Sequence, residues 1–478
     1  MPPSADTATD ARPVLHEDGL PTPRRYWAIL TVWLAMAMSV LDGAIANVAL
    51  PTIARELQAT EAASIWIVNA YQLAITVALL PLASLGDKIG YRRVYVAGLA
   101  VFTLGSLGCA LSGSLNELAA ARVVQGLGAA GIMSINSALV RLAYPRHLLG
   151  RGIGLNAVVI SVSAAVGPTV ASAILGVASW EWLFAINVPI GVLAVAIALR
   201  ALPRTEGSRR PLDFAAAGLN ALAFGGLILG AETLVREGPA QGLPILAVGV
   251  VAGVVLARRE LGRPAPMIPF DLLRIPIFGL SIATSIVSFA AQMLAYVALP
   301  FYFQGPLGRS AVETGLLMTP WPLAVGVAAP IAGRLADRYP AGALGGIGLA
   351  VFASGLGLLA LMPHDASSLD IAWRMAVCGL GFGFFQAPNN RAMVSSAPLQ
   401  RSGAAGGMLA TARLLGQTTG AVAMAAFFHI AGARATVTAL AVAAGVAALA
   451  GLVSLLRLRI PEAKAPGEPV AEAAVGPT

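Results

Sequence analysis

Two ionisable side chains inside apolar segments give this sequence its clearest chemistry. Asp42 lies in the apolar run 27–50, and Arg122 lies in the apolar run 118–140. A charge at the centre of a bilayer costs about 2.5–3.5 kcal/mol on insertion scales, so such residues usually serve ion or proton pathways. A change in the distance between a carboxylate and a guanidinium changes the affinity of the carboxylate for a proton. We therefore predict that Asp42 exchanges protons and that Arg122 modulates it; the alternative is that Asp42 serves local packing.

Charged residues at two helix ends predict a gate. The first cluster is Asp87 with Arg92 and Arg93, and the second is Asp337 with Arg338. Charge pairs between helices can hold one conformation of a switching protein. We predict that these clusters close the inner side of the protein; the alternative is that the arginines only orient the helices.

Aromatic, methionine and amide side chains recur at helical spacing in three late apolar segments. Aromatic faces attract cations, and methionine surfaces accommodate varied ligands. The pattern predicts a substrate cavity, although a lipid-facing position or core packing is the alternative for each residue taken singly. The predicted cavity residues are Phe289, Gln292, Met293, Tyr296, Met318, Trp321, Phe382, Phe385 and Gln386.

The composition excludes an ordinary soluble enzyme. Hydrophobic residues make up 57% of the 478 residues and charged residues only 11%, whereas about 25% charged residues is usual in soluble chains. The formal net charge of +8 is spread along the chain, so no nucleic-acid-binding face is indicated. Cys109 and Cys378 lie in apolar segments and predict no disulfide framework, and the four histidines show no metal spacing. We expect no cofactor and no metal.

Fourteen segments are long and apolar enough to cross a membrane, since about 20 apolar residues span the hydrocarbon core as a helix. The eighth segment is short. The segments are 27–50, 65–85, 94–112, 118–140, 152–178, 183–202, 214–234, 243–257, 277–299, 315–335, 342–361, 371–394, 407–430 and 436–456.

The basic residues give the expected direction of these helices. Of the 31 lysines and arginines, 24 fall in tails and loops on the side of the N-terminus, and three lie within spans. Only Arg55, Arg236, Arg309 and Arg434 fall in the opposite loops. Basic loops face the cytoplasm, so we predict fourteen spans with both termini inside. The tails, residues 1–23 and 459–478, are polar and are predicted to be disordered.

The chain repeats itself at a separation of 250 residues. Asp87 and Asp337 stand at equivalent helix ends, and on this alignment Asp42 falls on Gln292. Parallel repeats are a known transporter architecture, with the substrate site between the two halves. We predict a six-helix bundle at 24–203, two inserted helices at 204–262 and a second six-helix bundle at 263–458.

Six short motifs occur in order along the chain, at matching depths in the predicted spans. They are Leu41–Pro51 in the first span, Asp87–Arg93 and Gly333–Arg338 at inner helix ends, Arg122–Gly128 in the fourth span, Gly154 with Gly167 and Pro168 in the fifth, and Trp180–Gly191 at the entry to the sixth. Together they resemble the major facilitator superfamily, in particular its fourteen-span drug:proton antiporters, over residues 24–458. The resemblance implies that Gly154, Gly167 and Pro168 form an antiporter motif.

The resemblance implies an all-α integral membrane protein with 14 transmembrane helices, in two pseudo-symmetric six-helix bundles plus two inserted helices. It implies no enzyme but a proton-coupled antiporter that exports lipophilic, cationic compounds, such as quaternary ammonium compounds, dyes and antibiotics, by alternating access. The implied location is the bacterial inner membrane, and the implied partners are an amphipathic small molecule, protons and the lipid bilayer, with a monomeric state and no nucleic acid. Two alternatives stay open: an exporter dedicated to one neutral or anionic metabolite or antibiotic, and a non-transporting membrane sensor or scaffold.

Overall fold

The computed structural model describes residues 19–205, 213–261, 263, 270–398 and 401–459, and these ranges form helices joined by turns, without a strand. The disorder predicted for the two tails falls almost entirely on residues 1–18 and 460–478, which lie outside the described ranges. The predicted all-α class is confirmed for the part of the chain that the structure describes.

Thirteen segments of the described chain are long and apolar enough to cross a membrane. The last of them, Ala405–Arg459, contains two helices, so the thirteen segments make fourteen helical passes. In chain order the helices of these passes are α1 (Arg24–Glu56), α2 (Glu61–Ser64) with α3 (Trp66–Ile89), α4 (Tyr91–Ala110), α5 (Leu115–Ala143), α6 (Leu149–Leu175), α7 (Trp182–Ala185) with α8 (Asn187–Ala201), α9 (Phe214–Arg236), α10 (Pro239–Glu260), α11 (Pro276–Gln304), α12 (Ala311–Met318) with α13 (Pro320–Leu335), α14 (Ala341–Ala360), α15 (Ser368–Ser396), α16 (Ser402–Ala431) and α17 (Ala435–Leu456).

The eighth pass is longer than predicted. Apolar composition predicted residues 243–257, whereas α10 has 22 residues and begins at Pro239. Gly238, with φ of +90°, precedes the helix, and proline suits the first helical position because its missing N–H needs no partner there. The helix therefore starts before its apolar run, and hydropathy alone placed the start too late.

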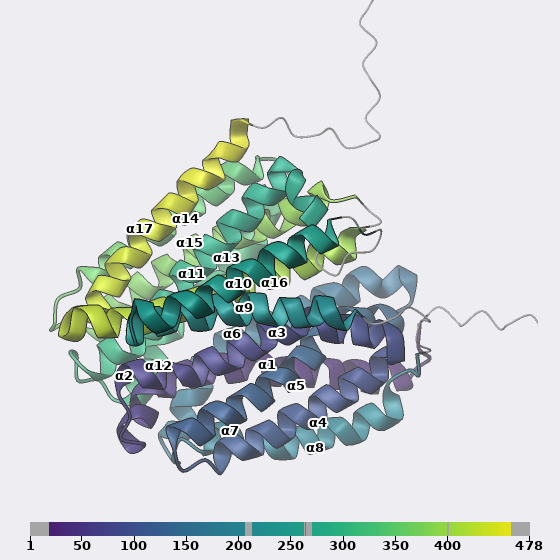
Figure 1. Ribbon diagram of the computed structural model, residues 1–478, viewed down its shortest axis with the longest axis horizontal. Helices are drawn as coiled ribbons and strands as arrows, with labels where there is room; N and C mark the ends of the chain where they lie inside the picture. The colour runs from purple at the N-terminus through teal and green to yellow at the C-terminus, as the bar shows by residue number, and fades with distance from the viewer. Residues whose placement is uncertain (1–18, 206–212, 262, 264–269, 399–400, 460–478) are drawn as a thin grey trace, which may run out of the picture.

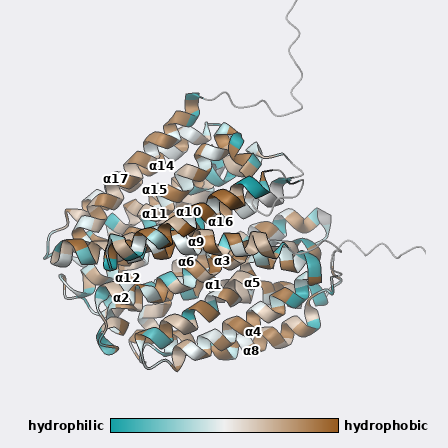
Figure 2. Cartoon of the chain, in the orientation of Figure 1, coloured by the Kyte–Doolittle hydropathy of each residue, from teal (hydrophilic) through white to brown (hydrophobic). Residues whose placement is uncertain are grey.

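The helices carry apolar residues along their length and polar residues at their ends (Figure 2). On α10 the side chains of Val248, Val251 and Val254 are exposed at the protein surface. Exposed apolar side chains on the outside of a bundle suit contact with lipid, because the hydrocarbon region contains no water and its lipid tails are themselves apolar. The hydropathy pattern thus fits a multi-pass membrane protein.

The passes are arranged as two bundles. The purple and blue helices form the lower bundle in Figure 1 and the green and yellow helices the upper one. The teal helices α9 and α10 pack on each other, and α9 also contacts α3 of the first bundle and α16 of the second. The domain limits given above for these bundles stay a prediction.

Equivalent glycines hold equivalent helices together in the two bundles. A Cβ added at Gly126 of α5 would lie 2.6 Å from the carbonyl oxygen of Tyr71, and one added at Gly379 of α15 would lie 2.1 Å from the carbonyl oxygen of Trp321. Real Cβ atoms do not come so close, so only glycine permits these contacts. Tyr71 and Trp321 are themselves 250 positions apart, so the sequence repeat is also a repeat of packing.

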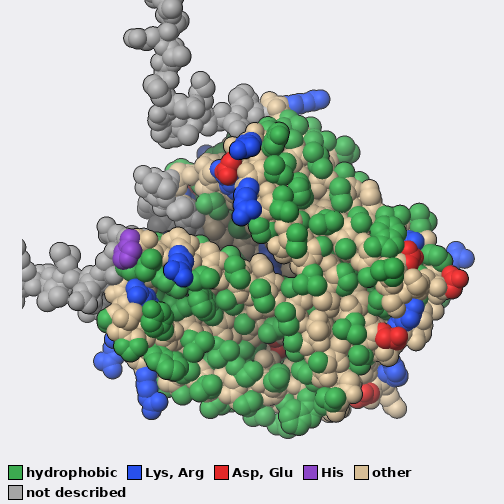
Figure 3. Space-filling model, turned by 180° about the vertical axis from the view of Figure 1, so that it is seen from behind, with side chains coloured by type: hydrophobic (Ala, Val, Ile, Leu, Met, Phe, Trp, Pro, Cys, Tyr) green, Lys and Arg blue, Asp and Glu red, His purple; other side chains and the backbone are tan. Residues whose placement is uncertain are grey.

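The two bundles touch at the end of the molecule that carries α2 and α12. Thr52 donates to Gln304 Oε1 at 3.2 Å, Gln304 Nε2 donates to the Val48 carbonyl at 3.1 Å, and the hydroxyls of Thr169 and Thr319 lie 2.8 Å apart. At the opposite end, no hydrogen bond or ion pair joins the two bundles within the described ranges. The surface is hollowed between the bundles when seen from behind (Figure 3).

Candidate functional site

Asp42 of α1 and Arg122 of α5 form an ion pair in the interior of the first bundle. Their side chains are 1% and 0% exposed. Ser114 fixes the start of α5, because its hydroxyl accepts the N–H of Glu117 at 3.3 Å and so places Arg122 two turns into the helix. The two residues predicted to act together are thus in direct contact, and their role in proton coupling stays a prediction.

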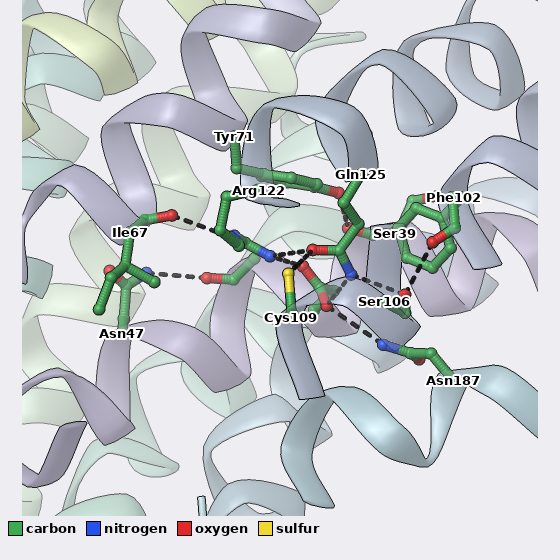
Figure 4. A network of polar contacts seen from close by, with 12 residues as sticks. Ser39, Asn47, Ile67, Tyr71, Phe102, Ser106, Cys109, Arg122, Gln125 and Asn187 are labelled. Atoms are coloured by element: carbon green, nitrogen blue, oxygen red, sulfur yellow. Dashed lines mark hydrogen bonds and ion pairs between the residues drawn. The ribbon is translucent and has the colours of Figure 1, made fainter. Parts of the chain in front are cut away.

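Two side-chain amides complete the environment of Asp42 (Figure 4). Gln125 Nε2 donates to Asp42 Oδ1 at 2.7 Å, and Asn187 Nδ2 donates to the same oxygen at 3.1 Å. Gln125 Oε1 in turn accepts from Arg122 Nη1 at 2.6 Å. Every recorded partner of the carboxylate is a donor, so both oxygens of Asp42 act as hydrogen-bond acceptors in this network.

The sequence analysis gave neither amide a role, although both lie in motifs that it quoted. Gln125 stands three residues after Arg122, a spacing that puts both side chains on one face of α5. Asn187 is the first residue of α8, after the break at Ile186 that separates α7 from α8. The spacing of Gln125 was a usable signal, whereas only the tertiary structure brings Asn187 to Asp42.

Arg122 is also held from the side of α3. Its Nε donates to the Ile67 carbonyl at 2.8 Å, and its guanidinium carbon lies 4.1 Å from the centroid of the Tyr71 ring. The Tyr71 hydroxyl donates to the Ser39 carbonyl at 2.9 Å. Arg122 Nη2 is buried without a hydrogen-bond partner among the described residues. The guanidinium is therefore held by groups of α3, while its Nη2 donor is unused among the described residues.

A cavity lies between the two bundles, with an empty volume of about 1160 Å³ that includes its open mouth. Residues of both bundles line it, and Tyr71 is among them, so the residue beneath Arg122 is also part of the cavity wall. Seven of the nine predicted cavity residues line this space, namely Phe289, Gln292, Met293, Tyr296, Trp321, Phe382 and Gln386. Contact of these residues with a substrate stays a prediction.

Met318 and Phe385 do not lie on the cavity wall. Both side chains are fully buried, with 0% exposure. Met318 is the last residue of α12, and its side chain packs in the buried core that also contains Trp321. Phe385 lies where α15 packs on α14, because a Cβ at Gly348 would fall 2.6 Å from its backbone nitrogen. For these two residues the prediction was wrong, and core packing, the stated alternative, holds.

Two polar residues on α16 line the cavity but were not among the predicted cavity residues. Arg413 and Gln417 both line the cavity, and their spacing of four residues places them on one helix face. Arg413 lies with its guanidinium carbon 5.9 Å from the ring centroid of Phe289. Among the lining residues Arg413 is the one that bears a charge. An arginine paired with an amide at this spacing in an apolar helix was a signal in the sequence.

The predicted gate residues lie at the open end, but their contacts differ from the expected ones. Asp87 is exposed and accepts from the Tyr91 hydroxyl at 2.6 Å, while Arg92 and Arg93 donate to backbone carbonyls. In the second bundle, Asp337 pairs with Arg391 of α15.

Within the described ranges, neither aspartate pairs with an arginine of its own cluster. Arg92 follows Asp87 across the turn that starts α4, and it reaches the carbonyl of Leu199 in α8 instead. Arg338 follows Asp337 directly in the chain, so the two side chains do not face each other, whereas Arg391 belongs to a neighbouring helix. Their role as a gate stays a prediction.

The three residues of the predicted antiporter motif have different surroundings. A Cβ on Gly167 would lie 2.5 Å from the Cβ of Ala44, so this glycine allows α6 to pack closely on α1 two residues from Asp42. Pro168 is buried inside α6. A Cβ on Gly154 would meet nothing within 4 Å. Only Gly167 therefore has a steric need for glycine, and the role of the motif in antiport stays a prediction.

Fourteen apolar helical passes around a central cavity define a membrane transporter of small molecules. Within the described residues, no group of three His, Cys, Asp or Glu is placed to hold a metal ion. The chain belongs to the Major Facilitator Superfamily, whose family model matches residues 32–421 and 280–477.

Relatives in this family carry different names. The chain is 53% identical to "Uncharacterized transporter YebQ" of Escherichia coli over 95% of this chain and 100% of that protein. It is 31% identical to "Riboflavin transporter RibZ" of Clostridioides difficile over 85% of this chain and 89% of the relative. It is 30% identical to "Tetracenomycin C resistance and export protein" of Streptomyces glaucescens over 87% of this chain and 78% of the relative.

Solved structures share the fold. A peptide transporter POT in complex with sulfate is similar with a TM-score of 0.69 and 15% identity, over 90% of this chain and 94% of that chain. A bacterial homolog of the human lysosomal transporter Spinster is similar with a TM-score of 0.67 and 14% identity, over 92% of this chain and 98% of that chain. At these identities the likeness describes the fold alone.

Proposed function

We propose that this protein is a proton-coupled antiporter that exports amphipathic small molecules by alternating access. The observation that supports this most is the Asp42–Arg122 pair, because it is a titratable carboxylate sealed in the bundle interior beside the substrate cavity. A buried charge pair carries a desolvation penalty that an apolar pair would avoid. Inside a membrane, ionisable residues that are retained despite this penalty commonly belong to ion or proton pathways.

The coupling step follows from the hydrogen bonds of the pair. Protonation of Asp42 removes its negative charge and therefore weakens its attraction for the guanidinium. Arg122 is then free to shift over the ring of Tyr71, which also lines the cavity. Protonation of Asp42 can thereby change the position of Tyr71 on the cavity wall through a single intervening side chain, that of Arg122.

We assign the open end to the cytoplasm, with both termini inside, because the basic residues collect there. In this inward-facing state Asp87 pairs with no arginine of the described ranges and accepts from the Tyr91 hydroxyl. We propose that its cluster forms charge pairs when the inner side closes, and that the Asp337 cluster acts beside it. We further propose that the membrane is the bacterial inner membrane. We also propose that the protein acts as a monomer, in which the two bundles of one chain suffice for transport.

Two cargo classes are candidates. The first is multidrug efflux of lipophilic cations, such as quaternary ammonium compounds, dyes and antibiotics, which the aromatic lining supports through cation–π contacts. The second is an exporter dedicated to one neutral or anionic metabolite or antibiotic. The second is favoured by one observation: no carboxylate is among the described residues that line the cavity, and Arg413 is. Relatives of similar identity are named for riboflavin and for tetracenomycin C, so membership of the family leaves the cargo open.

Uptake of a dye into inverted membrane vesicles tests the coupling. We expect a proton gradient to drive uptake in the wild type, a protonophore to abolish it, and Asp42→Asn to abolish it while the protein still inserts and folds. The asparagine keeps the size of the side chain and removes only the titratable group. Full gradient-driven uptake by Asp42→Asn would contradict the proposal.

A further inference from the structure

Two hydrogen-bond donors on the cavity wall have no acceptor. Arg413 makes no hydrogen bond and no ion pair with the described residues, and its one recorded contact is with the ring of Phe289. Trp321 is 1% exposed, and its indole Nε1 is buried without a partner in the described part of the chain. Trp321 Nε1 is a buried donor without an acceptor, which is costly, and Arg413 is a half-buried cation without a counter-charge among the described residues, so a ligand that supplies acceptors suits this part of the wall.

Aromatic rings connect these two donors. The ring of Phe289, beside Arg413, lies 5.2 Å from the ring of Phe382, and the ring of Trp321 lies 5.5 Å from that of Tyr296. Both pairs meet edge to face, at 75° and 84°. All four rings line the cavity. A flat, unsaturated molecule can make van der Waals contact with such rings over most of its surface, so the wall suits an aromatic ligand.

The carboxylate nearest the cavity is not available to a cationic ligand. Asp42 is 2% exposed, is not on the cavity wall, and accepts hydrogen bonds from Arg122, Gln125 and Asn187. Apart from the Trp321 indole, the other polar groups of the second bundle on the wall carry no charge, namely the amides of Gln292, Gln386 and Gln417 and the hydroxyl of Tyr296. A cation in this cavity would meet Arg413 and no opposite charge, whereas an anion would meet a guanidinium in an apolar surrounding, where charge-assisted hydrogen bonds are strong.

We propose that Arg413 binds an acidic group on an aromatic cargo, and that Trp321 Nε1 donates to a second acceptor of the same molecule. The substrate class is therefore an aromatic acid rather than a lipophilic cation. This inference rests on the proposed function in one respect, which is that the cargo occupies the central cavity; it does not depend on proton coupling.

Two xanthene dyes test the charge preference, because fluorescein and rhodamine 123 share a ring system and differ in charge. At pH 8 fluorescein is an anion, and rhodamine 123 is a cation. Binding to the purified full-length protein is measured by fluorescence anisotropy in the absence of any gradient. The variants are Arg413→Gln, Arg413→Lys and the matched control Arg374→Gln, which removes an arginine of the same bundle that does not line the cavity. Thermal unfolding of each variant shows whether it is folded.

We expect the wild type to bind fluorescein more tightly than rhodamine 123. Arg413→Gln should weaken fluorescein binding by about tenfold or more, as expected for the loss of a hydrogen bond to a charged group. Arg413→Lys should retain most of the binding, and Arg374→Gln should match the wild type. Trp321→Phe keeps the ring and removes the donor, so it should weaken fluorescein binding by a smaller factor.

The inference is overturned if the wild type fails to bind fluorescein, prefers rhodamine 123, or binds fluorescein equally well after Arg413→Gln. Vesicle uptake separates this inference from the proposed function. Fluorescein binding that depends on Arg413, without gradient-driven uptake, would contradict proton coupling and support the proposed cargo class. Gradient-driven uptake of rhodamine 123 that does not depend on Arg413 would support proton coupling and contradict the proposed cargo class.

Discussion

The two bundles place an arginine at equivalent depths and use it differently. Arg122 of α5 is fully buried and pairs with Asp42, which belongs to another helix. Arg374 of α15 is 13% exposed and pairs with Asp370, four residues earlier in the same helix. At the position equivalent to Asp42, the second bundle has Gln292, which lies on the cavity wall.

The packing that positions these residues is nevertheless the same in both bundles. Gly126 and Gly379 each lie against a backbone carbonyl, from Tyr71 and Trp321 respectively. Tyr71 lies beneath a guanidinium, whereas Trp321 lines the cavity and its buried indole Nε1 has no partner among the described residues. Duplication thus preserved the helix contacts, which any stable bundle needs, while the chemistry diverged. The comparison suggests that the first bundle handles protons and the second bundle handles cargo.

The largest expected difference is between substitutions of the two arginines, Arg122 and Arg374. Arg122→Gln leaves Asp42 buried without a cation, and breaking a buried pair costs about 3–5 kcal/mol. We expect it to reduce gradient-driven uptake by about a hundredfold or more. Arg374→Gln breaks a pair within one helix near the surface and should stay within about threefold of the wild type. Vesicle uptake, normalised to protein amount, measures the activity of both variants. Equal losses of uptake would contradict the assignment of proton handling to the first bundle alone.

A second, smaller effect tests the shared packing. Leucine at Gly167 must displace Ala44, and leucine at Gly416 must displace the Ile286 carbonyl, which lies 2.4 Å from an added Cβ. Overpacking of this kind costs about 1–3 kcal/mol, so both variants should lose thermal stability and at least about fivefold in uptake. Gly154→Leu is the matched control, because an added Cβ there meets nothing within 4 Å. A stable, fully active Gly167→Leu would contradict the packing argument.

The smallest expected effect concerns the two inner clusters. The side chains of Asp337 and Arg391 are 61% and 52% exposed, so water screens their attraction. We expect Asp337→Asn to slow uptake by only about twofold. Asp87→Asn should slow it by about fivefold, because we assign the charge pairs of this cluster to the closed inner side. Initial uptake rates decide the order, with membrane insertion checked by quantitative blotting; the reverse order would move the main gate to the second bundle.

Local patterns in the sequence predicted the helices and their number well. Spanning helices satisfy their own backbone hydrogen bonds, so their presence follows from composition along the chain. The eighth predicted segment was too short, because α10 starts at Pro239, before its apolar run. Seven of the nine predicted cavity residues line the space between the bundles, because helical spacing assigns residues to a face, and their contact with a substrate stays a prediction. Met318 and Phe385 are buried in the core instead.

The sequence by itself determined that Asp42 and Arg122 are costly residues in apolar segments, since each can be recognised from its own neighbours along the chain. Only the tertiary structure decided what they touch. Asn187 reaches Asp42 from 145 positions away, and Arg391 reaches Asp337 from 54 positions away. Hydropathy follows from local composition, whereas a hydrogen bond or ion pair depends on where separate helices come together. That is why the polar residues could be listed in advance, and why their partners, and the unpaired donor of Arg413, could not.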